Sequence, residues 1–381
     1  PDRLKDAAIN PCWRSSMAGT AAQMLPAVLG FTPMQPPRIA RRNHAKNGWR
    51  TPAIALVAMS AMTFAWSCKT KDKVTQPAPS ASATTADANS FVTDREYSKV
   101  DCTQPLSADS TAQTAIACTH ATDDSLLHLA ELTKLTSLYL GGTDVTDTGL
   151  VHLANLTQLT ELGIGYTAVS DVGLTHLANL TQLTELSLGS TAVSNAGLIY
   201  LANLTQLTKL DLSDNAVSDE GLTHLANLTQ LTELRLGNTR ITDVGLSHLA
   251  QLKQLSILDL WDTKITNLGL SHLATLTQLT ELTLNRTEVS SAGLTPLAHL
   301  TKRSKLGFKD TKTNDEGLRH LAKLGHLTEL DLGGTEITDA GLAQLTHLKK
   351  LTQLNLLGTK VTDAGCERLR ISLQNAYIAG C

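Results

Sequence analysis

The sequence predicts an α/β solenoid, in which short parallel strands alternate with short helices along an open stack. The first observation is a 24-residue unit, approximately LTxLTELxLxxTxVTDxGLxHLAN, that recurs ten times between Leu132 and Gly358. A fixed period of this length is typical of units that pack only on their neighbours. The second observation is that the apolar spacing changes inside each unit, from alternate residues to every third residue.

The first half of the unit predicts a strand, and the second half predicts a helix. In the first full unit, the inward strand positions are Leu135, Leu138 and Leu140. Stacked copies would form a parallel sheet with strands about 4.8 Å apart. In the helical half, 145–156, the residues on one face are Leu150, Leu153 and Leu156.

Three polar or small positions of the unit have structural explanations. Thr146 or Asp147 is placed to cap the helix by accepting hydrogen bonds from its free N–H groups. Gly149 recurs in every unit, which indicates close backbone packing or a positive φ. Thr143 and its equivalents form a column, replaced once by Asn215, whose hydroxyl or amide groups would satisfy backbone groups in a buried turn.

The repeat resembles the leucine-rich repeat family. The family core LxxLxLxxN is present as LTSLYLGGT at 135–143, with Thr in place of Asn. The TDxGL stretch is similar to a subclass found in bacterial surface proteins and in F-box ubiquitin-ligase adaptors. The resemblance implies a leucine-rich repeat horseshoe over 132–365, with a parallel concave sheet and short convex helices. It also implies a protein-binding role.

The region before the repeats is predicted to contain a leader and a linker. We expect residues 1–33 to be non-native or disordered, with translation beginning at Met34. Residues 34–68 combine a basic segment with an apolar run at 51–67, too short to span a bilayer, and end at Cys68. This arrangement resembles a bacterial lipoprotein signal and implies lipidation of Cys68, although Ala65 and Trp66 depart from the usual pattern. Simple cleavage, an uncleaved anchor and a segment without a targeting role are the alternatives. Residues 69–100 are predicted to form a flexible linker.

Modified copies of the repeat are predicted to cap both ends, at 101–131 and 366–381. Terminal repeats must cover a core that would otherwise be exposed. Each cap contains two cysteines, which suggests the disulfides Cys102–Cys118 and Cys366–Cys381 in an exported chain. Buried free thiols are the alternative.

Composition and motifs argue against several classes of function. The net charge of −3 and the lack of a basic stripe argue against nucleic-acid binding. No nucleophile, phosphate-binding or metal motif is present, so we expect neither catalysis nor a cofactor. Seven histidines share one position in the helical half of the unit. Successive units would project these side chains in parallel, whereas the ligands of a zinc ion must converge on it. We therefore expect a solvated histidine column and no metal.

Differences between otherwise identical units identify the candidate binding residues. Most lie on the strand face and in the following loop, and Trp, Tyr and Arg dominate binding hot spots. The candidates are Tyr139, Tyr166, Asp211, Arg235, Asp259, Trp261, Asp262 and Arg286. Glu161 and its equivalents form an acidic column interrupted by lysines, which is either a solvated strand face or a docking strip for a basic partner.

The unit at 301–324 is irregular. Arg303 replaces a core leucine and Thr313 replaces a core Val or Ile. Because an unpaired charge in a core is costly, we expect the Arg303 side chain to extend outward to solvent.

These observations predict non-catalytic protein–protein interaction through the concave face of an exported domain. The predicted location is the cell envelope, as an outer-membrane or periplasm-facing lipoprotein, or the secreted fraction. The membrane would be contacted only through the N-terminal lipid anchor. One alternative is an F-box-like substrate adaptor or secreted effector, but residues 74–113 are too polar to supply an F-box helix bundle. Another is a structural envelope protein that self-associates.

Overall fold

The computed structural model describes residues 98–103 and 114–381. The expected segment 1–33, the leader 34–68 with Cys68 and the linker up to residue 97 lie outside the described residues. In the described ranges, no helix has the length and apolar character needed to cross a membrane.

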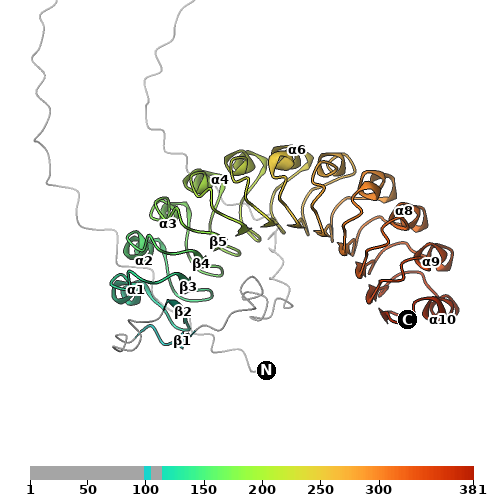
Figure 1. The fold of residues 1–381 in the computed structure, drawn as a ribbon, viewed down its shortest axis with the longest axis horizontal. Coiled ribbons are helices and arrows are strands. Elements are labelled where there is room, and N and C mark those ends of the chain that lie inside the picture. Colours follow the sequence, from blue (N-terminus) through green and yellow to red (C-terminus); the bar gives the residue numbers. More distant parts are fainter. Residues whose placement is uncertain (1–97, 104–113) are drawn as a thin grey trace, which may run out of the picture. The chain divides into compact units, whose positions relative to one another are not determined.

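The described residues form one parallel sheet of thirteen strands, ordered as in the sequence (Figure 1). Neighbouring strands pair one repeat apart, so that Leu138 lies beside Leu162 and Leu162 beside Leu186. The predicted solenoid is therefore confirmed. The strands are β1 (Ser98–Val100), β2 (Ala115–Cys118), β3 (Ser137–Tyr139), β4 (Glu161–Gly163), β5 (Glu185–Ser187), β6 (Lys209–Asp211), β7 (Glu233–Arg235), β8 (Ile257–Asp259), β9 (Glu281–Thr283), β10 (Lys305–Gly307), β11 (Glu329–Asp331), β12 (Gln353–Asn355) and β13 (Tyr377–Ala379).

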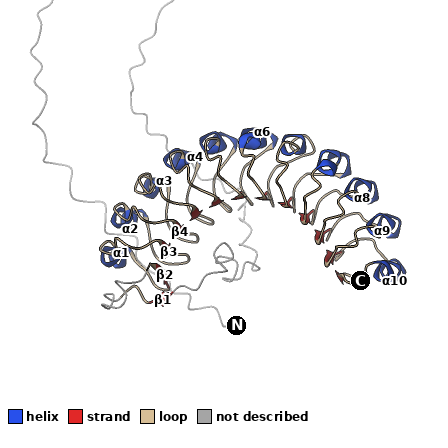
Figure 2. Cartoon of the chain, in the orientation of Figure 1, coloured by secondary structure: helices blue, strands red, loops and turns tan. Residues whose placement is uncertain are grey.

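Short helices line the outer side of the arc, and the strands line its inner side (Figure 2). We call each turn of the solenoid a coil and name it after its strand. The α-helices are α1 (Asp123–Leu129), α2 (Asp147–Leu150), α3 (Asp171–Leu174), α4 (Asn195–Leu198), α5 (Asp219–Leu222), α6 (Asp243–His248), α7 (Leu270–Leu273), α8 (Asp315–Leu321), α9 (Asp339–Leu345) and α10 (Asp363–Ser372). The 3-10 helices are η3 (Val151–Leu153), η4 (Ile199–Leu201), η5 (Thr223–Leu225), η6 (Leu249–Gln251), η7 (Ser291–Gly293) and η8 (Thr295–His299).

The core is a continuous stack of leucines between the sheet and the helices. Leu138 on β3 and Leu150 on α2 are fully buried, and their equivalents in the following coils are at most 8% exposed. A long stack of this kind buries apolar area in proportion to the number of coils. Stability therefore depends on each coil continuing the stack without interruption.

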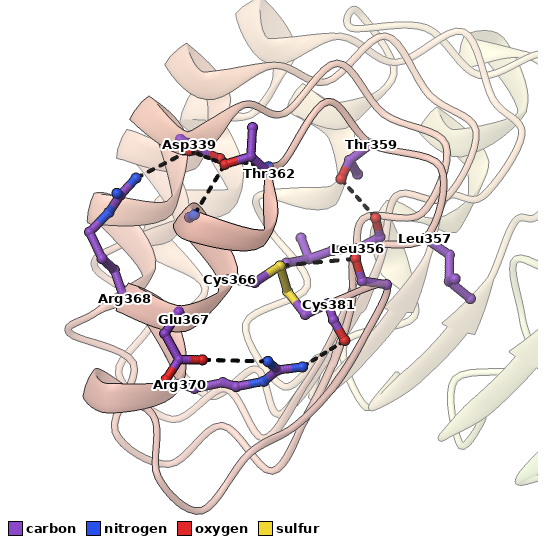
Figure 3. The surroundings of a disulfide bond; sticks show 12 residues. Asp339, Leu356, Leu357, Thr359, Thr362, Cys366, Glu367, Arg368, Arg370 and Cys381 are labelled. Carbon is purple, nitrogen blue, oxygen red and sulfur yellow. Dashed lines mark hydrogen bonds and ion pairs between the residues drawn. A yellow bond between two sulfur atoms is a disulfide. The ribbon is translucent and has the colours of Figure 1, made fainter.

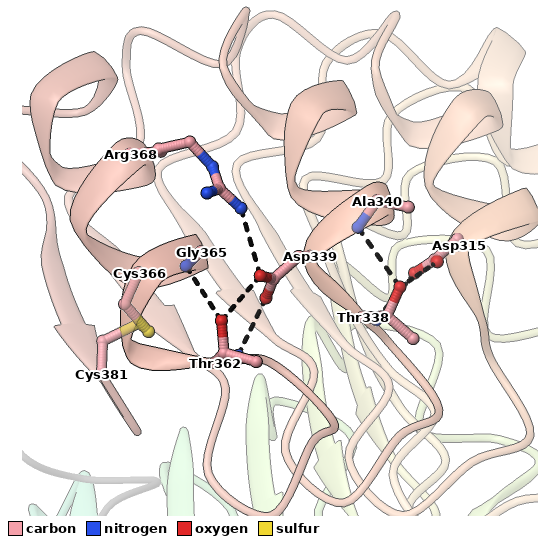
Figure 4. Close-up of polar contacts among 9 residues, drawn as sticks. All are labelled: Asp315, Thr338, Asp339, Ala340, Thr362, Gly365, Cys366, Arg368 and Cys381. Atoms are coloured by element: carbon pink, nitrogen blue, oxygen red, sulfur yellow. Dashed lines mark hydrogen bonds and ion pairs between the residues drawn. A yellow bond between two sulfur atoms is a disulfide. The ribbon is translucent and has the colours of Figure 1, made fainter.

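The TDxGL motif forms a polar ladder between successive coils, as the last coils illustrate (Figure 4). The Thr362 N–H and hydroxyl donate to the two carboxylate oxygens of Asp339, at 2.8 and 2.7 Å. The Thr362 oxygen in turn accepts from the Gly365 N–H at the start of α10, at 3.2 Å. The same threonine thus caps its own helix and joins it to the preceding one. Equivalent bonds join Asp123–Thr146, Asp147–Ser170, Asp171–Ser194, Asp219–Thr242, Asp243–Thr266 and Asp315–Thr338.

The invariant glycine of this motif is explained by close packing. A Cβ atom on Gly173 would lie 2.5 Å from Oδ1 of Asp147 in the preceding coil, and the Gly173 N–H donates to that oxygen at 3.0 Å. None of these motif glycines has a positive φ. Of the two explanations that the sequence left open, the close approach of the aspartate is therefore the correct one.

The threonine column lies at the turn that follows each strand. The Thr143 hydroxyl donates to the Leu140 carbonyl at 2.6 Å, and the equivalent threonines repeat this bond. Asn215 forms more hydrogen bonds than these threonines. Its amide nitrogen donates to carbonyls of two coils, and its amide oxygen accepts from the Thr191 hydroxyl at 2.9 Å. The structural role predicted for this column is confirmed.

Each cap contains a disulfide, with the pairings that the sequence suggested. Cys102 is bonded to Cys118 on β2, and Cys366 on α10 is bonded to Cys381 after β13 (Figure 3). The second disulfide joins the last helix to the last strand. Arg370 donates to the Cys381 carbonyl at 2.6 Å, so the end of the described chain is fixed to α10 by both a covalent and a polar contact.

The prediction for Arg303 was wrong. Its side chain is fully buried, and all three guanidinium nitrogens lack a hydrogen-bond partner. The side chain cannot extend outward because the following residues, Ser304 and Lys305, both bond the Thr280 carbonyl, as in the other coils. This register points position 303 into the leucine stack. The preceding coil is also irregular: its outer side has only the 3-10 helices η7 and η8, and Pro296 lacks an N–H donor.

Candidate binding site on the concave face

The concave face of the sheet is built from two columns of side chains on either side of the buried strand leucine. Because strand residues alternate between faces, the residues before and after that leucine both point away from the core. The first column contains Glu161, Glu185, Lys209, Glu233, Ile257, Glu281, Lys305, Glu329, Gln353 and Tyr377. The second column contains Tyr139, Gly163, Ser187, Asp211, Arg235, Asp259, Thr283, Gly307, Asp331, Asn355 and Ala379.

Most charges of the first column are paired within the sheet. Lys209 contacts Glu185 at 3.1 Å. Lys305 lies between Glu281 and Glu329, at 3.6 and 3.4 Å. Burial disfavours the charged form of Lys305, but the attraction of the two glutamates outweighs this effect and raises the pKa of Lys305. The predicted solvated acidic column is therefore only partly present.

Tyr139 is buried at the N-terminal end of the concave face, with only 7% of its surface exposed. Its hydroxyl donates to the Glu161 carboxylate, and Glu161 itself is 3% exposed. Its ring covers Gly163, where a Cβ atom would lie 2.9 Å from the ring. Tyr139 therefore presents little surface to a binding partner. Glu161 is buried and does not belong to a solvated strand face.

A group of unlike side chains occupies the centre of the concave face, on β6–β8. Arg235 lies between Asp211 and Asp259 in the strand register and bonds Glu233 through both Nε and Nη2, at 2.8 Å each. Asp259 accepts a hydrogen bond from the Trp261 N–H at 3.2 Å. Both aspartates are partly buried, and the charge of Arg235 acts on each of them.

Burial changes the acidity of these two aspartates. It raises the pKa of Asp259 to about 6, against the opposing hydrogen bond from the Trp261 N–H and the charge of Arg235. It also raises the pKa of Asp211, where the hydrogen bond from Ser213 and the same arginine oppose it. Each carboxylate is therefore poorly solvated, and a cation placed beside it would stabilise its charged form.

Trp261 is half-buried because it lies on a glycine of the preceding coil. A Cβ atom on Gly237 would lie 1.9 Å from the indole Nε1 of Trp261. The glycine therefore provides the flat surface on which the indole packs, while the rest of the ring remains accessible. Asp262 and Arg286 follow in the turns after β8 and β9, with positive φ values of 51° and 58°, and form an ion pair at 3.1 Å.

The structure therefore brings six of the eight predicted residues together over four neighbouring coils. They are Asp211, Arg235, Asp259, Trp261, Asp262 and Arg286, which we call the central cluster. Tyr166 is 41% exposed in the turn after β4 and lies outside this cluster, as does the buried Tyr139.

Sequence reasoning missed a hollow of about 370 Å³ on the concave side of β9–β13. Gly307 lies in its lining, and Lys305, Asp331 and Tyr377 contribute to its walls. The sequence signal that could have revealed it is a glycine in the second column without an aromatic neighbour to cover it.

The histidine column lies on the helical side and is partly exposed in each coil, as predicted. Among the described residues, no three or more His, Cys, Asp or Glu side chains are gathered closely enough to hold a metal ion.

Comparison with known proteins agrees with this architecture. A family model described as "Leucine-rich repeat region" matches residues 189–381, half of the chain, and one described as "Leucine Rich repeat" matches residues 131–154. The chain belongs to the leucine-rich repeat family. Leucine-rich repeat domains are generally scaffolds for protein–protein interaction and are typically non-catalytic. No curated protein sequence matches the chain.

Several solved leucine-rich repeat structures are similar to this one. An internalin from Listeria monocytogenes is 25% identical, with a TM-score of 0.50, and the match covers 72% of this chain and 89% of that chain. A plant peptide hormone receptor, RGFR1 in complex with RGF2, is 16% identical with a TM-score of 0.46, covering 70% and 47% of the two chains. The ectodomain of the Arabidopsis receptor kinase HAESA, in complex with a peptide hormone, is 18% identical with a TM-score of 0.46, covering 62% and 40%. The chain thus spans less than half the length of either plant receptor.

Proposed function

We propose that this leucine-rich repeat protein binds a protein partner through the concave face, without catalysis, and that the central cluster is its main contact. The observation that carries the proposal is the contrast between a uniform framework and a locally varied face. Core positions repeat almost unchanged, whereas β6–β9 present a tryptophan, two arginines and three aspartates within four coils. Tryptophan and arginine are enriched among residues that dominate binding energy.

The geometry of the cluster supports this assignment. Trp261 is held flat by Gly237, so that little side-chain freedom would be lost on binding. Arg286 is 53% exposed and already oriented by Asp262. An anchor that is ordered before binding loses less entropy when the complex forms.

Site-specific photo-crosslinking in cells that naturally make the protein tests this proposal. A photoreactive residue at Thr283, on the concave face, is expected to form one discrete protein adduct. The matched position is Thr175, which is exposed on the outer side of the same solenoid. Adducts of equal yield at both positions, or none at Thr283, would contradict the proposal. A ladder of adducts with the protein itself would instead favour self-association.

We also propose that the protein is exported and held at the cell envelope through lipidation of Cys68. Two disulfides support export, because such bonds persist in oxidising compartments. The leader residues themselves lie outside the described part of the chain. Intact-mass measurement of the protein from the membrane fraction tests this: a mature N-terminus at Cys68 carrying lipid is expected. An unprocessed, reduced protein would contradict export and favour the substrate-adaptor alternative.

A further inference from the structure

The hollow on β9–β13 differs in chemistry from the rest of the concave face. It is about 370 Å³ in volume, and its floor is formed by strand leucines, including Leu306 and Leu330. These two leucines are only 3% and 2% exposed, so the floor is mainly the backbone of the strands. The hollow therefore combines an uncharged floor with charged walls.

One residue in the lining of the hollow is a glycine. Gly307 occupies the second column, where most coils place a larger residue. The other glycine of that column, Gly163, is covered by the ring of Tyr139. Over Gly307, the nearest atom to an added Cβ is Oδ1 of Asn285, at 2.6 Å, and that oxygen already accepts from the Lys309 N–H. The Asn285 side chain therefore covers Gly307, and both residues line the hollow.

The walls are net acidic. The charged residues that line the hollow are Glu281, Glu329, Asp331 and Lys305, which gives three carboxylates against one ammonium group. Lys305 is shared by the two glutamates and compensates them only in part.

Asp331 is the carboxylate best placed for a ligand. Its Oδ1 accepts from the Gly333 N–H at 3.0 Å and from Nδ2 of Asn355 at 2.8 Å. These two bonds fix its orientation, and in the described part of the chain they are its only hydrogen bonds. Its second oxygen is therefore available, and a planar cation could bond it.

Tyr377 provides an aromatic wall at the end of the hollow. It lies on β13, in strand register with Gln353, and is 74% exposed. A phenol ring and carboxylates in the walls of one hollow suit a side chain that has an apolar stem and a cationic end, because the ring face attracts cations.

We propose that the hollow binds an arginine side chain of the protein partner. The arginine stem lies across the strands that form the floor of the hollow, and its guanidinium group faces the carboxylates of Asp331 and Glu329. Arginine fits better than lysine because its planar group can bond two carboxylate oxygens at once. The proposal deepens the proposed function, since it requires the concave face to be the binding surface.

Ligand-observed NMR on the full chain tests the site directly. The probe is the capped peptide Ac-Gly-Gly-Arg-Gly-Gly-NH2, and its counterpart carries citrulline, which has the same shape without the charge. Saturation transfer to the arginine methylenes is expected, with at least tenfold weaker binding of the citrulline peptide. Equal binding of both peptides, binding of neither, or preference for a neutral saccharide would overturn the proposal.

A matched pair of variants locates the site. Asp331→Asn is expected to weaken binding of the arginine peptide at least tenfold. Asp144→Asn is the control, because Asp144 is an exposed aspartate of the same solenoid that lies outside both the hollow and the central cluster. It should change the affinity less than twofold. Equal effects of the two variants would refute the site, and Glu329→Gln provides a second test should Asp331→Asn unfold.

The same variants separate this inference from the proposed function. If Asp331→Asn leaves the partner affinity unchanged while variants of Trp261 and Arg286 reduce it, only the arginine site is refuted. If none of these changes affects the partner, the concave face itself is not the binding surface.

Discussion

Replacing Arg303 by leucine is expected to stabilise the protein strongly. Every other full coil places a leucine at this position, for example Leu279 and Leu327 in the neighbouring coils, and both are fully buried. Arg303 is equally buried, but its guanidinium group has no hydrogen-bond partner. The variant would restore the leucine stack and remove an unpaired charge from the core.

The size of the effect follows from the pKa of Arg303. Burial lowers that pKa from its usual value to about 9. A difference of about 3.5 pH units, at 1.36 kcal/mol for each unit, corresponds to a folding penalty of about 5 kcal/mol. Small local movements relieve part of such a penalty, so the expected gain for Arg303→Leu is about 2–5 kcal/mol.

Equilibrium denaturation in guanidinium chloride measures this gain as a shift of the transition midpoint. The control is Arg319→Leu, the same substitution at an exposed site on α8, which should change the stability by less than about 0.5 kcal/mol. The advantage of Arg303→Leu should be constant from pH 6 to 8. It should shrink above pH 9, because the folded protein then releases a proton that the unfolded chain keeps. No gain, or a loss of stability, would refute the reasoning that Arg303 is an unpaired core charge.

Three further substitutions test other parts of the structure. Gly173→Ala should destabilise the protein by about 1–3 kcal/mol in thermal melts, because the added Cβ clashes with the aspartate of the preceding coil. Gly325→Ala is the control and should be nearly neutral, because no atom lies near the added Cβ. Replacing Cys366 and Cys381 together by serine should cost about 3 kcal/mol in denaturant titrations, because the disulfide closes a loop of 15 residues; an unchanged midpoint would show that the cap is held by other contacts. Asp259→Asn should stabilise the protein at pH 7.5 but not at pH 4, because the raised pKa makes the ionised carboxylate unfavourable in the folded state above about pH 6; a gain of equal size at both pH values would contradict this.

The regular part of the fold could be predicted from the sequence because the repeat determines it. Strand, helix cap and threonine column each depend on contacts that every coil makes with the next, so one unit predicts all of them. A structural role for the glycine of the TDxGL motif could also be predicted, although the sequence left two explanations open, close packing and a positive φ. Only the position of the Asp147 carboxylate beside Gly173 decides between them.

The departures from the repeat were harder to predict, because their outcome depends on single neighbours. Tyr139 was expected to be an exposed contact, but the bare Gly163 of the next coil and the Glu161 carboxylate draw it into the sheet. Arg303 was expected to extend outward, but the strand register directs it into the core. Apart from Gly307, no single position of the repeat predicts the hollow on β9–β13, because residues of five coils line it.

The affinity of the partner for two matched double variants tests the central claim most directly. The concave variant carries Trp261→Ala and Arg286→Ala, and the outer-side control carries Val244→Ser and Leu268→Ser, at two exposed apolar positions of the helical side. Both variants must first be shown to be folded. Titration calorimetry with the partner that photo-crosslinking identifies should then give at least a hundredfold weaker binding for the concave variant. The affinity of the control should change less than twofold. Unchanged binding by the concave variant, or an equal loss in the control, would contradict recognition through the concave face.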